Sequence, residues 1–126
     1  MVERDRLPAD RVAALERGAR AETLAAEALT RDGWTVLARN WRARGGELDI
    51  VVERAGVLRF VEVKARDPHD DTGLDAISYS KRRKLVAAAE AWLVERGPPE
   101  VEVAFMVAVV SFEPTGWSIE WLDDAF

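Results

Sequence analysis

The chain has 126 residues, 48% of them hydrophobic, and its 23 Asp and Glu outnumber its 18 Lys and Arg to give a formal net charge of −5. It contains no Cys and a single His, His69, which excludes disulfides, thiolate nucleophiles and zinc–thiolate sites and argues against a multi-histidine metal site. The negative charge disfavours nucleic-acid binding through the overall field, so such a role would depend on local basic patches.

This length suits one domain, residues 1–126, with residues 1–9 as a loose lead-in. The apolar runs are too short to span a bilayer, and the charged start MVERDRLPAD is unlike a signal peptide. We therefore expect a soluble, cytoplasmic protein with no membrane partner.

A first helix is predicted from Asp10, as its N-cap, to about Arg31, with Gly33 just past its end. Its apolar face comprises Leu15, Ala19, Ala25, Ala26 and Leu29. Glu22 falls near the middle of this face, one turn after Gly18. Two interpretations are open: a carboxylate at the core margin satisfied by an Arg, or a third carboxylate directed at a functional site, with Gly18 allowing close approach of the backbone.

A first strand is predicted from Trp34 to Trp41, followed by the pair Gly45-Gly46. Three arginines lie along and after it: Arg39, Arg42 and Arg44. Arginine suits bidentate contacts to phosphate, but the same side chains could neutralise nearby carboxylates.

A hairpin is predicted from Gly46 to Arg66, the sequence GELDIVVERAGVLRFVEVKAR, because its residues alternate with a period of two. Ala55-Gly56 is the predicted loop, since Gly accepts the positive φ that a tight hairpin needs. A two-residue loop there pairs Arg54 with Val57; an odd-length loop or a bulge would shift the pairing.

Counting outward from that loop, Asp49 faces Glu62 and Glu47 faces Lys64. Opposed like charges destabilise a sheet, so Asp49 and Glu62 need compensation. Lys64 would supply part of it, and a divalent cation such as Mg²⁺ would supply more. The alternative is a solvated face on which Glu and Lys simply alternate.

The loop 67–75 contains four Asp and His69, which could transfer a proton or be merely solvated. A second helix is predicted from about Leu74 to Arg96, ended by Gly97-Pro98-Pro99, with the apolar face Leu85, Ala88, Ala89, Trp92 and Leu93. The run Lys81-Arg82-Arg83-Lys84 near its start could contact a nucleic-acid backbone or form a solvated face.

Val101 to Val110 is apolar on both faces, which is typical of a central strand. Trp117 to Leu122 is predicted to be an edge strand after a turn at 113–116. The order is then α-β-β-β-α-β plus a final strand, an α/β fold with a mixed central sheet flanked by helices.

This order and several motifs resemble the restriction-endonuclease-like superfamily, whose signature is PD-(D/E)-x-K. More closely, the chain resembles the YraN-like family, which is grouped with the endonucleases and related to the archaeal Holliday junction resolvases. The motifs that carry the resemblance are Gly18 with Ala21-Glu22, Asn40-x-Arg42, Gly46-Glu47-Leu48-Asp49-Ile50, Phe60-Val61-Glu62-Val63-Lys64, and then Gly73, Ile77 and Lys81.

The resemblance implies a restriction-endonuclease-like αβββαβ core and a metal-dependent endonuclease acting on DNA, with branched or flapped DNA of repair or recombination as a candidate substrate. Asp49 and Glu62 would ligate Mg²⁺ or Mn²⁺, with the Val63 carbonyl as a further ligand and Glu22 ligating directly or through water. Lys64 would position or help deprotonate the attacking water.

Glu47 would orient the site or pair with Lys64 or an Arg. The expected nucleic-acid-binding residues are Arg39, Arg42, Arg44, Arg66, Lys81 and Arg82. By analogy with resolvases, a homodimer is a further expectation.

Two departures from the pattern bear on activity. Leu48 stands where the superfamily often has Pro, and Ala104-Phe105-Met106 stands where the family tends to have Arg-Phe-Asp. Two other hypotheses therefore accompany the nuclease: a non-catalytic nucleic-acid-binding module of the same fold, and a protein-interaction domain with a structural cation site.

Overall fold

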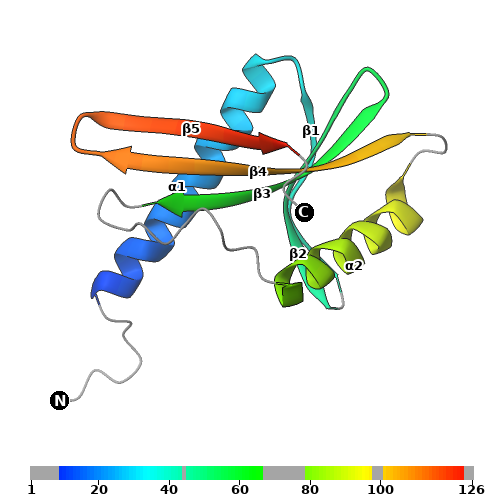
Figure 1. The fold of residues 1–126 in the computed structure, drawn as a ribbon, viewed down its shortest axis with the longest axis horizontal. Helices are drawn as coiled ribbons and strands as arrows, with labels where there is room; N and C mark the ends of the chain where they lie inside the picture. Colours follow the sequence, from blue (N-terminus) through cyan, green and yellow to red (C-terminus); the bar gives the residue numbers. More distant parts are fainter. Residues whose placement is uncertain (1–8, 44, 67–78, 98–100, 124–126) are drawn as a thin grey trace.

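The computed structural model describes residues 9–43, 45–66, 79–97 and 101–123, which form two helices and one five-stranded sheet (Figure 1). In chain order the elements are α1 (Ala9–Arg31), β1 (Thr35–Ala43), β2 (Gly46–Arg54), β3 (Val57–Arg66), α2 (Tyr79–Arg96), β4 (Glu102–Glu113) and β5 (Gly116–Asp123). Within these residues, neither helix is both long and apolar enough to cross a membrane.

The strands lie in the sheet in chain order, from β1 at one edge to β5 at the other. The pairs β1–β2, β2–β3 and β4–β5 are antiparallel. Strands β3 and β4 are parallel, and α2 lies in the connection between them, as a parallel pair requires. The mixed sheet, the αβββαβ core and the added C-terminal edge strand are therefore as predicted.

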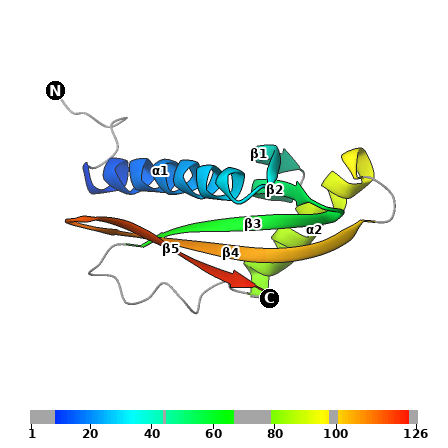
Figure 2. The same cartoon turned by 90° about the horizontal axis from the view of Figure 1, so that it is seen from above.

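The two helices cover opposite faces of the sheet, and each face has its own apolar cluster (Figures 1 and 2). The cluster under α1 comprises Ala25, Ala26, Leu29, Trp34, Ile50, Val52, Val61, Met106 and Ala108. The cluster under α2 comprises Leu48, Val51, Leu58, Phe60, Ala88, Ala89 and Trp92. Strand β4 contributes to both clusters through Met106 and Phe105, which confirms its central position.

The β2–β3 hairpin turns at the predicted residues. Ala55 has a φ of 50° and Gly56 a φ of 79°, and Arg54 pairs with Val57. Two successive positive φ values are typical of the two-residue loop whose twist matches that of the flanking strands.

The two strands of this hairpin separate before they reach the charged residues. Their ladder runs from Arg54↔Val57 to Ile50↔Val61 and stops there. Beyond it β2 continues to pair with β1, and β3 with β4, so the strands diverge into a fork (Figure 1). The predicted cross-strand pairs of Asp49 with Glu62 and Glu47 with Lys64 are therefore wrong as ladder pairs, because the strands are no longer adjacent there.

Helix α1 is buried over a shorter length than predicted. It begins at Ala9, so Asp10 lies within the helix rather than at its N-cap. Leu15 is 59% exposed and Ala19 is also exposed, because the N-terminal turns extend past β3 (Figure 1). A Cβ on Gly18 would have no atom within 4 Å, so Gly18 does not serve a close backbone approach.

Other boundaries differ by a few residues. Strand β1 runs to Ala43 rather than ending at Trp41, and its pairing with β2 shifts between Val36 and Ala38, an irregularity that the alternating pattern did not reveal. Helix α2 presents the predicted apolar face and ends at Arg96. The loop 67–75 with His69, and the predicted first residues of α2 (74–78), lie outside the described residues.

Candidate active site

Asp49 lies at the fork between β2 and β3. Its Oδ2 accepts a hydrogen bond of 2.8 Å from the backbone N–H of Val63, so the side chain bridges the diverging strands. Strand β2 also rotates here: Leu48 packs in the α2 cluster and Ile50 in the α1 cluster, although residues two apart in a strand normally share a face. On the neighbouring strand, Asn40 has a φ of 50°, a second departure from regular geometry.

The environment of Asp49 disfavours its negative charge. Burial, followed by the facing carboxylate of Glu62, raises the pKa of Asp49 from 3.8 to about 7, although the hydrogen bond from Val63 acts in the opposite direction. The charge of Glu22 adds a smaller upward contribution to that pKa. Strongly perturbed carboxyl groups of this kind are concentrated at functional sites.

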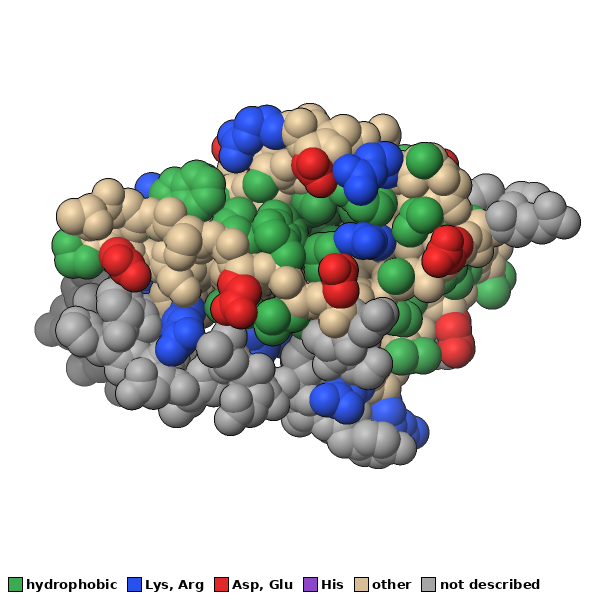
Figure 3. Space-filling view, turned by 45° about the horizontal axis from the view of Figure 1, so that its top comes forward, with side chains coloured by type: hydrophobic (Ala, Val, Ile, Leu, Met, Phe, Trp, Pro, Cys, Tyr) green, Lys and Arg blue, Asp and Glu red, His purple; other side chains and the backbone are tan. Residues whose placement is uncertain are grey.

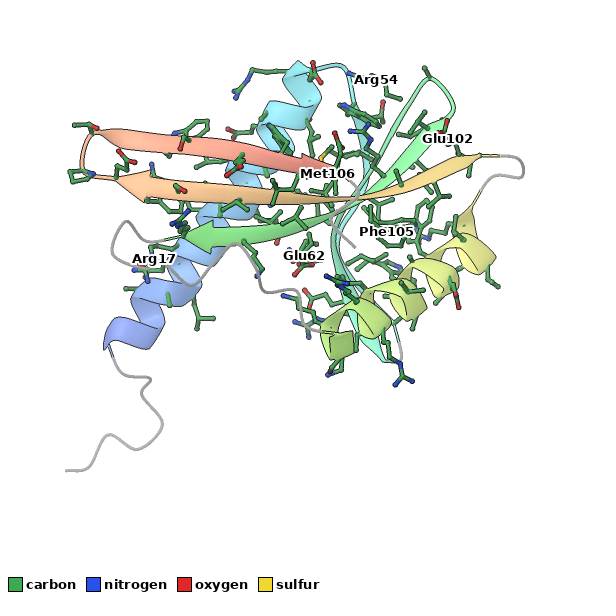
Figure 4. All side chains as sticks on the ribbon, in the orientation of Figure 1. Arg17, Arg54, Glu62, Glu102, Phe105 and Met106 are labelled. Carbon is green, nitrogen blue, oxygen red and sulfur yellow. The ribbon has the colours of Figure 1, made fainter. Side chains whose placement is uncertain are left out.

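Glu62 is 6% exposed and lies between β3 and the first turns of α2 (Figure 4). Its Oε1 is 2.6 Å from Nζ of Lys81, so Glu62 and Lys81 form an ion pair. Lys81 is thus a compensating cation that was not predicted in this role, and the predicted contribution of Lys64 stays a prediction. Lys64 follows Glu62 by two residues on the same face of β3 and is half-buried.

Glu22 is 9% exposed on α1, and its Oε1 is 3.3 Å from Nε of Arg39 on β1. The pKa of Glu22 is raised because its burial outweighs the charge and hydrogen bond of Arg39. Both sequence interpretations are therefore met in part: an Arg satisfies the carboxylate, and the carboxylate is also close enough to Asp49 to influence its pKa.

Two hollows meet at Asp49 and Glu47, which line both. The first, of about 440 Å³, is on the α1 side and is lined by Ala14, Leu15, Gly18, Ala19, Glu22, Thr23, Arg39, Asn40, Glu47, Asp49 and Val63. The second, of about 230 Å³, is on the α2 side and is lined by Glu47, Asp49, Glu62, Lys81, Lys84 and Leu85. The three predicted carboxylates are thus grouped around Asp49, and the fork makes it accessible from both sides of the sheet.

The arginines next to the site pair mainly with its acidic residues. Arg42 lies opposite Glu47 in the β1–β2 ladder, with Nε 3.6 Å from Oε2, so Glu47 has an Arg partner, one of the two predicted possibilities. Arg39 pairs with Glu22. Arg82 is exposed on α2 and Arg66 lies at the end of β3, whereas Arg44 lies outside the described residues. Basic and acidic side chains are similarly interspersed on the face shown in Figure 3.

Within the described ranges, no group of three His, Cys, Asp or Glu side chains has the arrangement of a preformed metal site. The donors nevertheless suit a hard cation, because two carboxylates, Asp49 and Glu62, face each other at a distance where their repulsion raises a pKa. A divalent cation between them would replace that repulsion with two attractions. The ligand and catalytic roles of Glu22, Asp49, Glu62, Val63 and Lys64 stay predictions.

The Lys81–Glu62 ion pair was not anticipated, although the sequence contained a signal for it. Lys81 precedes Leu85 by four residues and Ala88 by seven, so it lies in line with the buried stripe of α2, at the exposed start of the helix. A cation in that position is directed toward the sheet. Glu22 on the apolar face of α1 is directed toward the sheet for the same reason.

The residues in place of the family's Arg-Phe-Asp are packed with apolar neighbours. Phe105 stacks at 5.5 Å from the ring of Phe60, and Met106 is 4% exposed in the α1 cluster. Met106 pairs with Asp123 in the β4–β5 ladder, and Asp123 Oδ1 is 3.3 Å from NH1 of Arg59.

The α1–β1–β2–β3–α2–β4 arrangement, with Asp49 near the start of β2 and Glu62 in the middle of β3, defines a restriction-endonuclease-like α/β protein. The chain belongs to the uncharacterised protein family UPF0102, which is the YraN-like family and whose model matches residues 21–111. It is 40% identical over 110 residues to a UPF0102 protein of Desulforapulum autotrophicum, covering 86% of this chain and 91% of that one. It is 38% identical over 109 residues to one of Synechococcus sp. strain CC9902, covering 84% and 90%.

Proposed function

We propose that the protein is a metal-dependent phosphodiesterase that cleaves DNA as an endonuclease. One observation carries this proposal. The partly buried carboxylate of Asp49 faces Glu62 at the fork between β2 and β3, and Lys64 follows Glu62 on the same face of β3. Two facing carboxylates, with a lysine two residues after one of them on the same strand, are the groups that phosphodiester hydrolysis with a divalent cation requires.

Asp49 and Glu62 would hold Mg²⁺ or Mn²⁺, with the backbone carbonyl of Val63 and the carboxylate of Glu22 completing the set. When bound, the ion would polarise the scissile phosphate and lower the pKa of a bound water. The hydrogen bond from Val63 N–H to Oδ2 restricts the orientation of the Asp49 carboxylate, which lines the hollows on both sides of the fork. The ion would also take over the neutralisation of Glu62 from Lys81.

Lys64 would stabilise the developing negative charge through its Nζ and help to remove the proton from the attacking water. Its position on β3 gives it a fixed direction, since β3 is paired with β4 at Lys64↔Val109. On the opposite side of Asp49, the small and apolar residues Ala14, Leu15, Gly18 and Ala19 of α1 leave room for a sugar or base of the DNA strand.

The test is cleavage of linear, flapped and branched DNA in Mg²⁺ or Mn²⁺ by the wild type, Asp49→Asn and Lys64→Met. Asn keeps the acceptor for the Val63 N–H while removing the charge. We expect at least a hundredfold loss in each variant. Glu120→Gln, an exposed carboxylate on β5, is the matched control and should cleave like the wild type. Cleavage that persists in Asp49→Asn would identify a contaminant and refute the proposal.

One observation favours a second candidate, a non-catalytic DNA-binding module. Glu62 and Glu22 already have cationic partners within the protein, Lys81 and Arg39. A site neutralised in this way could bind a DNA backbone without holding a metal. DNA binding in Mn²⁺ with no cleavage of any substrate would establish this candidate in place of the nuclease.

A further inference from the structure

We propose that a third hollow, next to the one that contains Asp49 and Glu62, is a phosphate subsite for the DNA strand. This inference rests on the proposed action on DNA. This hollow, of about 350 Å³, is lined by Gly45, Ser80, Arg83, Lys84 and Ala87. Among these described lining residues are two cations and one hydroxyl, and none is acidic. In a chain whose net charge is −5, a hollow of this composition selects an anion.

Lys84 connects this hollow to the candidate active site. It lines the hollow with Arg83 and Ser80, and it also lines the neighbouring hollow that contains Asp49 and Glu62. The two hollows are therefore adjacent and share Lys84 of α2 as a lining residue. A DNA strand whose scissile phosphate lies at the carboxylates would place a neighbouring phosphate next to Lys84, because phosphates repeat regularly along the strand.

The walls of the subsite are held in a fixed relation to each other. A Cβ on Gly46 would overlap the backbone carbonyl oxygen of Lys84 and would be 3.2 Å from the Cβ of Ala88. Only glycine therefore allows the start of β2 to pack this closely on α2. This contact places Gly45 beside the side of α2 that carries Ser80 and Arg83.

The chemistry of the lining matches a phosphodiester. An arginine can donate two parallel hydrogen bonds to phosphate oxygens, a lysine supplies a compact positive charge, and a serine hydroxyl donates one hydrogen bond. Two other cations of the same basic run lie elsewhere. Lys81 lines the hollow that contains Asp49 and Glu62, and Arg82 lines neither of the two hollows.

The test compares Arg83→Met/Lys84→Met with Arg82→Met, which removes one positive charge from the adjacent position, and the two are compared per charge removed. DNA binding is measured by fluorescence anisotropy at several salt concentrations, in the Asp49→Asn background so that no strand is cut. We expect the double variant to bind severalfold more weakly and to lower the slope of log K against log salt by about one for each lost contact. Arg82→Met should change the slope less.

A second measurement locates the phosphate. Oligonucleotides that carry one uncharged methylphosphonate at successive positions are tested for binding to the Asp49→Asn parent and to the double variant in the same background. One position should weaken binding by the Asp49→Asn parent and have no further effect on the double variant. The subsite is refuted if the protein binds DNA but the double variant behaves like Arg82→Met. It is also refuted if no methylphosphonate position affects the parent alone. In both cases the proposed function stands. If the wild type binds no DNA, both fail.

Discussion

The carboxylate of Asp49 accepts a hydrogen bond from the backbone N–H of Val63 across the gap where β2 and β3 separate. This contact replaces a backbone ladder bond with a side-chain bond, and it keeps Asp49 next to Glu62 although the strands no longer pair. The fold therefore holds two carboxylates together and makes room between the strands at the same place.

Asp49→Asn should stabilise the protein at pH 8 and have little effect at pH 4. The pKa of Asp49 is raised from 3.8 to about 7, so the folded protein retains a proton that the unfolded chain has lost. Stability of the wild type should fall as the pH rises between these values and then level off, with each pK unit corresponding to about 1.4 kcal/mol. Urea denaturation from pH 4 to pH 9 measures this.

Glu120→Gln serves as the control, because this carboxylate is exposed on β5. If the unfolding free energies of Asp49→Asn and the wild type differ by the same amount at every pH, the raised pKa of Asp49 is disproved.

Lys81→Met should strengthen Mn²⁺ binding. Nζ of Lys81 is 2.6 Å from Oε1 of Glu62, so the ammonium group competes with a metal ion for this carboxylate. We expect a severalfold lower dissociation constant at pH 8, measured by calorimetry without DNA. Arg82→Met controls for the loss of a positive charge on α2. Weaker Mn²⁺ binding in Lys81→Met would show that Lys81 instead holds Glu62 in the geometry that binds metal.

Arg39→Met should destabilise the protein more than Glu22→Gln does. Removing the guanidinium leaves a carboxylate that is 9% exposed without its partner, which costs about 1–3 kcal/mol. Glu22→Gln removes the charge whose burial is unfavourable, as the raised pKa of Glu22 shows, so the loss of the ion pair is partly offset. The double variant should recover much of the loss from Arg39→Met in chemical denaturation. Equal losses in the two single variants would argue against this ion pair.

Gly46→Ala should destabilise the protein by about 1–3 kcal/mol, because its Cβ would overlap the backbone of α2 at Lys84. Gly18→Ala is the matched comparison. A Cβ there meets no atom within 4 Å and lies in an exposed helical turn, so this variant should be stabilised by about 0.5–1 kcal/mol. Thermal unfolding of both variants measures the contrast, and a Gly46→Ala protein as stable as the wild type would contradict the observed packing.

Local patterns in the sequence determined most of the elements. The positive φ required at Gly56 fixed the hairpin loop, the apolar face of α2 followed from helical spacing, and the continuous apolar run of β4 marked a central strand. Each of these depends on neighbours along the chain, which is why each could be predicted. Glu22 was also identified in this way, as a charge on an apolar helical face.

The tertiary structure alone decided how the charges of the site are paired. Strand pairing was predicted to continue to Asp49 and Glu62, but the sheet divides there because each strand follows a different neighbour. That fork admits α2 on one side and α1 on the other, so Lys81 neutralises Glu62 and Arg39 neutralises Glu22. Such partners are distant in the chain, and only the twist of the sheet and the crossing of the helices bring them within reach of each other.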